Sequence, residues 1–183
     1  MKKSTIYNMA TCAIMAAVMC VLGPLSIPVG PVPISLLTLA IYLAAYVLGA
    51  KGTTLSVCIY ILLGAVGLPV FSGAAGGLAK IAGPTGGYIL GYLFLAFICG
   101  LFVHKSKANV LISVLGMIVG TIVLYGFGTL WFIIQMKTDL LSALTMCVLP
   151  FIAGDLVKIV AATLMGKALR AALTKANLLP EQY

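Results

Sequence analysis

The chain alternates between long uncharged apolar stretches and short clusters of charge, glycine and proline. Charged side chains are absent from residues 4–50, 52–79, 81–103, 108–136 and 140–154. A helix needs about 20 apolar residues to cross the hydrocarbon core of a bilayer. The first stretch is too long for one such helix, and its prolines divide it. We therefore expect six helices, at residues 5–23, 34–50, 53–68, 86–103, 109–135 and 141–173.

The amino-acid composition indicates whether these helices lie in water or in a lipid bilayer. The chain of 183 residues is 63% hydrophobic and 8% charged, with a mean hydropathy of +1.23. Ordinary soluble domains are about 45–50% apolar and about 25% charged. Too few charges remain to cover a soluble surface of this size, and a disordered chain is far more polar. The prediction is an all-α integral membrane protein with six transmembrane helices in one domain that spans residues 1–183.

The distribution of basic residues orients these helices. One side receives eight of the eleven Lys and Arg residues, which are Lys2, Lys3, Lys51, Lys105, Lys107, Lys167, Arg170 and Lys175. The other side receives Lys80 and Lys137, and Lys158 lies inside the last helix. Cytoplasmic loops carry the excess of Lys and Arg. Both termini are therefore expected in the cytoplasm of a multi-pass cell-membrane protein, and the net charge of +8 does not require nucleic acid as a partner.

The last helix carries the feature that most needs a reason. Asp155 and Lys158 are three residues apart and share a helix face, in the middle third of an apolar segment. A charge in the hydrocarbon region costs at least about 2.5–3.5 kcal/mol. The pair is either a structural ion pair or, as we favour, a ligand site that offers a carboxylate and an ammonium group. Pro150 and Gly154 are expected to interrupt the helix just before it and leave backbone groups free.

Two outer connections are candidates for lining such a site. Residues 69–88 are glycine-rich and are expected to be irregular, either lining a cavity or forming a tight packed turn. The helix start at 83–87 presents backbone N–H groups that favour an anion. Lys80 either reaches a ligand carboxylate or faces solvent. The proline-rich segment Ser26–Pro33 is either a lid or a short rigid loop.

Small residues and cysteines complete the candidates. Gly116 and Gly120 in the fifth helix, and Ala13 and Ala17 in the first, form stripes that let helices approach closely. For both stripes internal packing is favoured over a partner-binding face. The five cysteines lie in apolar runs without metal-binding spacing and are expected to be buried free thiols. The chain has no HExxH, GxSxG or nucleotide-binding motif, so an intramembrane enzyme is poorly supported.

Three segments together resemble the BioY family, the biotin-binding S components of energy-coupling factor (ECF) transporters. They are Pro31–Leu39, Gly64–Gly73 running on to Gly83–Tyr88, and Pro150–Lys158. Their order and spacing fit over roughly residues 8–172. The family pattern after the first loop reads Pro-Ile-Thr-x-Gln, whereas this chain has Ser35 and Leu37.

The resemblance implies a six-helix protein that binds biotin near the outer face, with Asp155 and Lys158 in contact with the ligand. It also implies that Gly83, Thr85, Gly86 and Tyr88 line the pocket. From the residues themselves, the carboxylate of the ligand is expected to meet either the positive helix start at 84–88 or Lys80. Ala13 and Ala17 resemble the family surface that meets the transmembrane coupling subunit, which raises the partner interpretation of that stripe. No cofactor is expected beyond biotin as the transported ligand.

The expected function is therefore a biotin-binding subunit without enzymatic activity, in the cell membrane of a prokaryote. Partner ATP-binding cassette ATPases would energise transport through the coupling subunit. The alternative is a stand-alone secondary transporter for a small vitamin-like solute, in which Asp155 serves as an ion or proton site.

Overall fold

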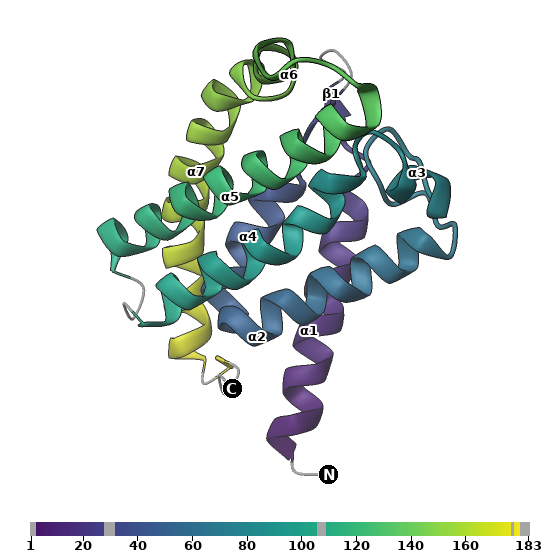
Figure 1. The fold of residues 1–183 in the computed structure, drawn as a ribbon. Helices are drawn as coiled ribbons and strands as arrows, with labels where there is room; N and C mark the ends of the chain where they lie inside the picture. The colour runs from purple at the N-terminus through teal and green to yellow at the C-terminus, as the bar shows by residue number, and fades with distance from the viewer. Residues whose placement is uncertain (1–2, 28–31, 106–108, 177, 180–183) are drawn as a thin grey trace.

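Helices make up nearly all of the fold in the computed structural model, which describes residues 3–27, 32–105, 109–176 and 178–179 (Figure 1). The elements in chain order are α1 (Lys3–Leu22), β1 (Ser26–Ile27), β2 (Ile34–Ser35), α2 (Leu37–Ala65), α3 (Leu78–Ala82), α4 (Gly86–Lys105), α5 (Val110–Met136), α6 (Leu140–Cys147) and α7 (Leu149–Lys175). Among the described residues, four helical stretches are long and apolar enough to cross a membrane, and a shorter apolar helix covers Ile6–Leu22. The longer stretches are Leu37–Ala65, Gly86–Lys105, Val110–Met136 and Leu140–Lys175.

The second and third expected helices are joined in α2, and the expected turn at Lys51-Gly52 was wrong by a few residues. Gly49 has φ 66° and ψ −166° inside α2, whereas its neighbours are helical. Only glycine adopts this backbone conformation without strain. The hydroxyl of Thr53 donates to the carbonyl oxygen of Gly49 at 2.7 Å and supports the break. The chain therefore reverses within α2, and its two arms diverge in Figure 1.

The interruption of the last helix also differs from the expectation. Val148, with φ −126° and ψ −56°, separates α6 from α7. Pro150 lies in the first turn of α7, where a missing N–H leaves no hydrogen bond unmade. Gly154 is helical, so it does not interrupt the helix before Asp155. The prediction that this glycine frees backbone groups for a ligand was wrong.

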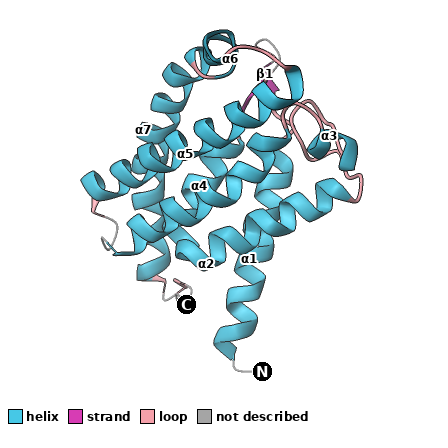
Figure 2. Cartoon of the chain, in the orientation of Figure 1, coloured by secondary structure: helices cyan, strands magenta, loops and turns pink. Residues whose placement is uncertain are grey.

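The connections at one end of the bundle are more regular than expected. Strands β1 and β2 form a short antiparallel hairpin, so the second helix begins at Leu37 rather than at residue 34 (Figure 2). In the segment Ser26–Pro33, expected to be a lid or a short rigid loop, Ser26 and Ile27 form β1, and residues 28–31 lie outside the described chain. The glycine-rich segment contains the helix α3 and a bridge between Phe71 and Ala75, so it is not irregular throughout.

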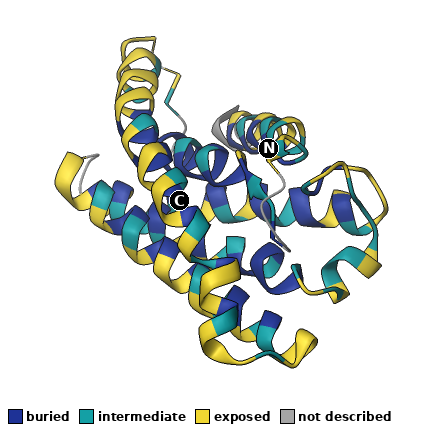
Figure 3. Cartoon of the chain, turned by 90° about the horizontal axis from the view of Figure 1, so that it is seen from above, coloured by how far each residue is buried: buried dark blue, intermediate teal, exposed yellow. Residues whose placement is uncertain are grey.

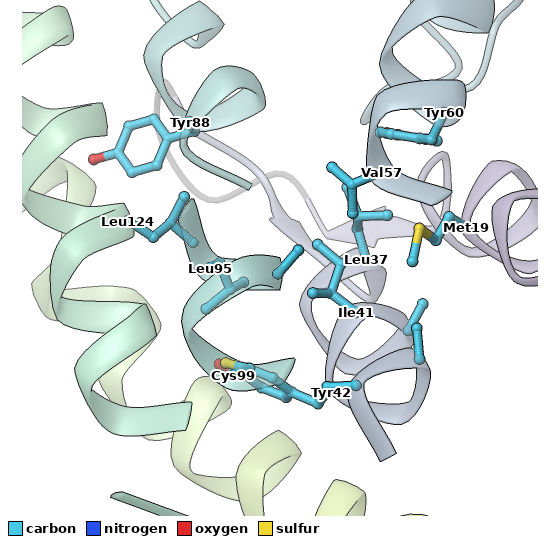
Figure 4. Close-up of a cluster of buried hydrophobic side chains, with 14 of the residues drawn as sticks. Met19, Leu37, Ile41, Tyr42, Val57, Tyr60, Tyr88, Leu95, Cys99 and Leu124 are labelled. Atoms are coloured by element: carbon cyan, nitrogen blue, oxygen red, sulfur yellow. The ribbon is translucent and has the colours of Figure 1, made fainter. Parts of the chain in front are cut away.

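The core lies between α1, both arms of α2, α4 and α5. Fully buried aromatic and aliphatic side chains fill it, and several are drawn in Figure 4: Met19, Leu37, Ile41, Tyr42, Val57, Tyr60 and Leu95. Exposed positions follow the outward sides of the helices in Figure 3. The five cysteines are free. Cys12, Cys99 and Cys147 are buried as expected, whereas Cys20 and Cys58 are only partly buried.

Two ends of the bundle can be distinguished in Figure 1. The N-terminus, the reversal of α2 and the C-terminus lie toward one end, and the hairpin, α3 and α6 lie toward the other. Lys51 follows the reversal of α2 and Lys167 lies in the second half of α7, whereas Lys80 belongs to α3 and Lys137 follows α5.

Candidate ligand site

The two charged residues of the last helix are buried, and their side chains contact each other directly. Nζ of Lys158 lies 2.9 Å from Oδ1 of Asp155, and the two residues are 8% and 5% exposed. Both sit on the inward face of α7, where the spacing of three residues brings them together. The prediction that Asp155 and Lys158 share a helix face is therefore confirmed, and the two residues form an ion pair inside the bundle.

Three other elements hold the pair in place. The carbonyl oxygen of Ser35 in β2 accepts a hydrogen bond from Nζ of Lys158 at 2.7 Å. The hydroxyl of Thr38 in α2 donates to Oδ1 of Asp155 at 3.5 Å, and that of Tyr125 in α5 donates to Oδ2. Residues from β2, α2, α5 and α7 thus meet at one point. The network satisfies charges whose burial alone would be strongly unfavourable.

The backbone around Ser35 explains why its carbonyl is available to the lysine. Oγ of Ser35 donates to the carbonyl oxygen of Gly23 at 3.0 Å and accepts from the N–H of Leu37 at 3.1 Å. This side chain ties the end of α1 to the start of α2 and fixes the turn between them. The departure from the family pattern at Ser35 therefore has a structural role, while Leu37 is buried in the core.

A small hollow of about 30 Å³ is lined in part by the pair, and a second hollow of about 20 Å³ shares part of its lining. Both are lined by Val32, Pro33, Tyr88 and Tyr92, so they form neighbouring parts of one region. Asp155, Lys158, Ser35, Thr38 and Tyr125 belong to one hollow, and Lys80, Thr85, Ser72, Tyr60 and Phe71 belong to the other. The region thus has an ion pair at one end and a lysine with a hydroxyl at the other, with aromatic walls between them.

The glycine-rich segment contributes to this region only in part. Lys80 is half-buried, and it lines a hollow together with Thr85 and the ring of Tyr88. Gly86 is a packing residue instead, because a Cβ there would overlap the backbone of Ile81. The N–H of Gly86 donates to Gly83 at 3.0 Å, and the N–H of Tyr88 donates to Thr85 at 3.1 Å. These two N–H groups of the helix start are therefore already bonded within the segment and are not free for an anion.

Gly83 lies at the edge of the region and is anchored by the fifth helix. Nε1 of Trp131 donates to the carbonyl oxygen of Gly83 at 3.0 Å, and the side chain of Gln135 donates to Ala82 at 2.9 Å. Gly83 is not among the residues that line the two hollows. The structure therefore brings Asp155, Lys158, Lys80, Thr85 and Tyr88 to one region and leaves Gly83 and Gly86 in supporting positions.

Sequence reasoning missed the contributions of Ser35, Thr38, Tyr92 and Tyr125. The carbonyl of Ser35 carries no side-chain signal, so sequence cannot reveal it. Tyr125 and Thr121 were visible as polar residues four apart in the apolar α5, which places them on one face. That spacing identifies an inward face, but it does not identify the helix opposite.

The two stripes of small residues differ in the structure, because one is exposed and the other packs against a neighbouring helix. Ala13 and Ala17 are exposed, while Cys12, Ala16 and Met19 on the other side of α1 are buried. The structure therefore does not support internal packing of this stripe. The partner-binding interpretation, which the resemblance raised above internal packing, stays a prediction. Gly116 and Gly120 do pack internally, because a Cβ on them would press against Phe102, Leu95 and Cys99 of α4.

Comparisons with known proteins identify the family of this chain. The BioY family model matches residues 1–175. The biotin transporter BioY2 of Lactococcus lactis subsp. cremoris is 36% identical over 177 residues, which is 97% of each chain. The biotin transporter BioY of Thermotoga maritima is 40% identical over 147 residues, 80% of this chain and 85% of that one.

A solved structure has the same fold. The S-component for biotin from an ECF-type ABC transporter superposes with a TM-score of 0.86 and 34% sequence identity, and it covers 93% of this chain and 95% of its own. The expected resemblance is thus confirmed at the levels of sequence and fold. With a family match over nearly the whole sequence, this chain belongs to the BioY family.

Proposed function

We propose that this protein is the biotin-binding membrane subunit of an ECF-type uptake transporter, and that it is not an enzyme. The buried Asp155–Lys158 pair, placed beside a region with aromatic walls, is the observation that carries the proposal. Membership in the BioY family and the likeness to a biotin S-component support the same substrate.

The chemistry of biotin matches the two ends of the region. Its ureido ring has N–H donors for the carboxylate of Asp155 and a carbonyl oxygen that accepts from Lys158. Its thiophane ring and aliphatic chain suit the walls formed by Tyr92 and Phe71, and its carboxylate suits Lys80 with Thr85. Specificity arises because a ligand without these groups leaves buried polar atoms unpaired, at a cost of about 1–3 kcal/mol each.

Entry of the ligand requires part of the wall to move. The hollows measure about 20 and 30 Å³, while pockets for small ligands usually measure about 300–1,000 Å³. Val32 and Pro33, just before β2, line both hollows and belong to the hairpin segment. This hairpin is therefore the candidate lid, and its opening gives biotin access from the outer side.

The proposed topology follows from the two arms of α2. If the reversal at Gly49 makes each arm a separate crossing, then α1, these arms, α4, α5 and the α6–α7 stretch give six crossings within one domain. Both termini then lie on the side that carries most of the Lys and Arg residues, the cytoplasmic side of a prokaryotic cell membrane.

Partner subunits supply the energy for transport. The exposed face of α1 that contains Ala13 and Ala17 is the proposed contact for the transmembrane coupling subunit. That subunit transmits ATP hydrolysis by cassette ATPases to this chain. Replacement of Ala13 by Trp is expected to block copurification of the coupling subunit and to leave biotin affinity unchanged. Loss of biotin binding in A13W would instead return this face to a structural role.

Titration calorimetry of biotin into the full-length purified protein tests the binding site. The wild type is expected to give saturable heat without ATP, and D155N and K158A are expected to weaken binding at least about 100-fold, because each removes a charged partner. K167A is the matched control, since Lys167 is exposed on the same helix α7. Absence of saturable heat in the wild type, or full affinity in both site variants, would contradict the proposal.

The ion-coupled alternative is less favoured because membership in the BioY family and the likeness to a biotin S-component support a subunit of an ECF transporter. Uptake by the lone protein in vesicles, driven by an ion gradient and abolished in D155N, would favour that alternative. Uptake that needs partner subunits and ATP would reject it.

A further inference from the structure

A second, larger space also borders the Asp155–Tyr125 contact. It is a cleft of about 620 Å³ between α5, α6 and α7. Apolar side chains dominate its walls, including Ile118, Ile122, Leu130, Leu144, Ile152 and Leu156. Its size falls within the range of pockets that bind small molecules. The proposed biotin site does not use it.

The cleft lies between helices that can cross a membrane and opens on their outer surface. Its walls belong to Val110–Met136 and Leu140–Lys175, two stretches that can cross a membrane. Ile122, Leu130 and Leu156 are 63%, 60% and 53% exposed, so the cleft opens outward from the bundle. In a bilayer this opening faces hydrocarbon chains rather than water.

The polar atoms of the lining are all engaged elsewhere. Thr121 pairs with the hydroxyl of Tyr42 at 2.6 Å, and Thr129 pairs with that of Tyr88 at 2.9 Å. The remaining polar side chains of this described lining, Tyr125 and Asp155, bond to each other. The walls therefore offer no unused donor or acceptor side chain to a polar ligand, and they fit an apolar occupant.

Gly126 provides an independent sign that the space is meant to stay open. A Cβ at Gly126 would meet no atom within 4 Å, although the residue lies in the middle of α5 and lines the cleft. Gly116, Gly120 and Gly128 of the same helix each have a close neighbour that a Cβ would press against. Glycine within a helix is about 1 kcal/mol less favourable than alanine. Within the described part of the protein nothing packs against Gly126, whereas a molecule lying in the cleft would pack against it.

We propose that the cleft between α5, α6 and α7 binds one acyl chain of a membrane phospholipid, which packs against Gly126 and against the outer side of the Tyr125–Asp155 contact. Asp155 and Tyr125 line both this cleft and the hollow of the biotin site. An acyl chain there keeps water from the outer side of the carboxylate. It also fills a space that would otherwise forfeit dispersion contacts.

Photolabelling tests the lipid site directly. The full-length protein is reconstituted in vesicles of phosphatidylethanolamine and phosphatidylglycerol with a trace of phosphatidylcholine that carries a diazirine in its acyl chain. Labelled peptides are expected to map to the walls of the cleft. G126W should reduce that labelling by about tenfold, because the indole fills the space. I134W is the matched control, since Ile134 is 75% exposed on α5 and does not line the cleft.

The outcomes separate lipid from other occupants. Equal labelling of the cleft in the wild type, G126W and G126L would overturn the proposal. So would a change of oligomeric state in G126W and G126L but not in I134W, because a second copy of the chain would then fill the cleft. Thermal unfolding with a Tm close to that of the wild type shows that the variants fold.

A second measurement addresses the link to the ligand and rests on the proposed function. Delipidation in detergent is expected to weaken biotin binding by the wild type several-fold, and G126W is expected to resist this loss because its indole replaces the acyl chain. Equal loss in both would overturn the link. If the wild type bound no biotin in any lipid, the proposed function would fail while the labelling result would still stand.

Discussion

Two spaces border the same carboxylate, and they differ in nearly every other respect. On the hairpin side, Ser35, Thr38, Lys80 and Lys158 bring donors and acceptors to small hollows. On the α5–α6 side, the larger cleft has apolar walls whose polar side chains are already paired. The contact between Tyr125 and Asp155 separates them. The polarity of the lining, rather than the volume of the space, therefore indicates which space suits a vitamin and which suits a lipid.

The largest expected effect comes from breaking the ion pair on one side only. K158A leaves a buried carboxylate without its cation, which should lower the free energy of unfolding by about 3–5 kcal/mol. The double variant D155N/K158M removes both charges and should recover most of that loss, while biotin binding stays absent in both. Thermal unfolding in detergent measures the stabilities. A double variant as unstable as K158A would show that the pair matters to packing more than to charge.

Removal of the Tyr125 hydroxyl tests whether the contact between Tyr125 and Asp155 serves the ligand site and the cleft in different ways. Y125F keeps the ring and deletes the hydroxyl that donates to Asp155. A hydrogen bond to a charged group contributes about 1.5–3 kcal/mol, so biotin affinity should fall by at least about tenfold. Acyl-chain labelling should not change, since the ring still forms the wall. Y7F is the control, because the hydroxyl of Tyr7 bonds to Leu178 far from the site. Unchanged affinity in Y125F would remove Tyr125 from the site.

Two glycines of α5 give a contrast of intermediate size. A Cβ at Gly128 would overlap the ring of Tyr88, which lines both hollows, whereas Gly126 faces the cleft. G128A should therefore lower the free energy of unfolding by about 1–3 kcal/mol through overpacking. G126A should leave it unchanged or raise it slightly. Equal Tm values for these variants would mean that the two sides of α5 are equally loose.

The smallest effect concerns the helix that forms the outer wall of the cleft. Asp139 caps α6, and the backbone N–H of Ser142 donates to its carboxylate at 2.9 Å, which lowers the pKa of Asp139. A lowered folded-state pKa means that the stabilisation is present above the unfolded value, near 3.9, and is lost as the pH falls through the folded value. The Tm should therefore fall slightly more for the wild type than for D139N between about pH 6 and pH 3. A steeper fall in D139N would contradict the capping role.

The apolar helices and the charged pair were predictable from sequence, because a local energetic cost governs where each can lie. Apolar runs must lie in the bilayer, so helix ends came within a few residues of α1, α4 and α5. A buried charge needs a partner, and this requirement led to Asp155 and Lys158. The reversal at Gly49 escaped prediction because the charge and glycine of Lys51-Gly52 gave the more obvious turn signal.

What sequence could not supply was the relation between segments far apart in the chain. Ser35 and Lys158 meet across 123 positions through a backbone carbonyl, and no side-chain pattern records such a contact. Ile34 and Ser35 directly precede the apolar run of the second helix, so the sequence assigned them to that helix rather than to a strand paired with β1. The cleft at Gly126 is likewise defined by side chains from three helices that do not fill it.

The hydrogen bond from Trp131 to the carbonyl oxygen of Gly83 makes the intrinsic tryptophan fluorescence of the protein a probe of the glycine-rich segment. Trp131 is the sole tryptophan of the chain, so its fluorescence arises from one known place. The indole sits where α5 anchors the segment that carries Lys80 and Thr85. Any displacement of that segment on ligand binding alters the polarity and hydrogen bonding of the indole. Emission wavelength and intensity can then follow the motion in real time, without a label or an added chromophore.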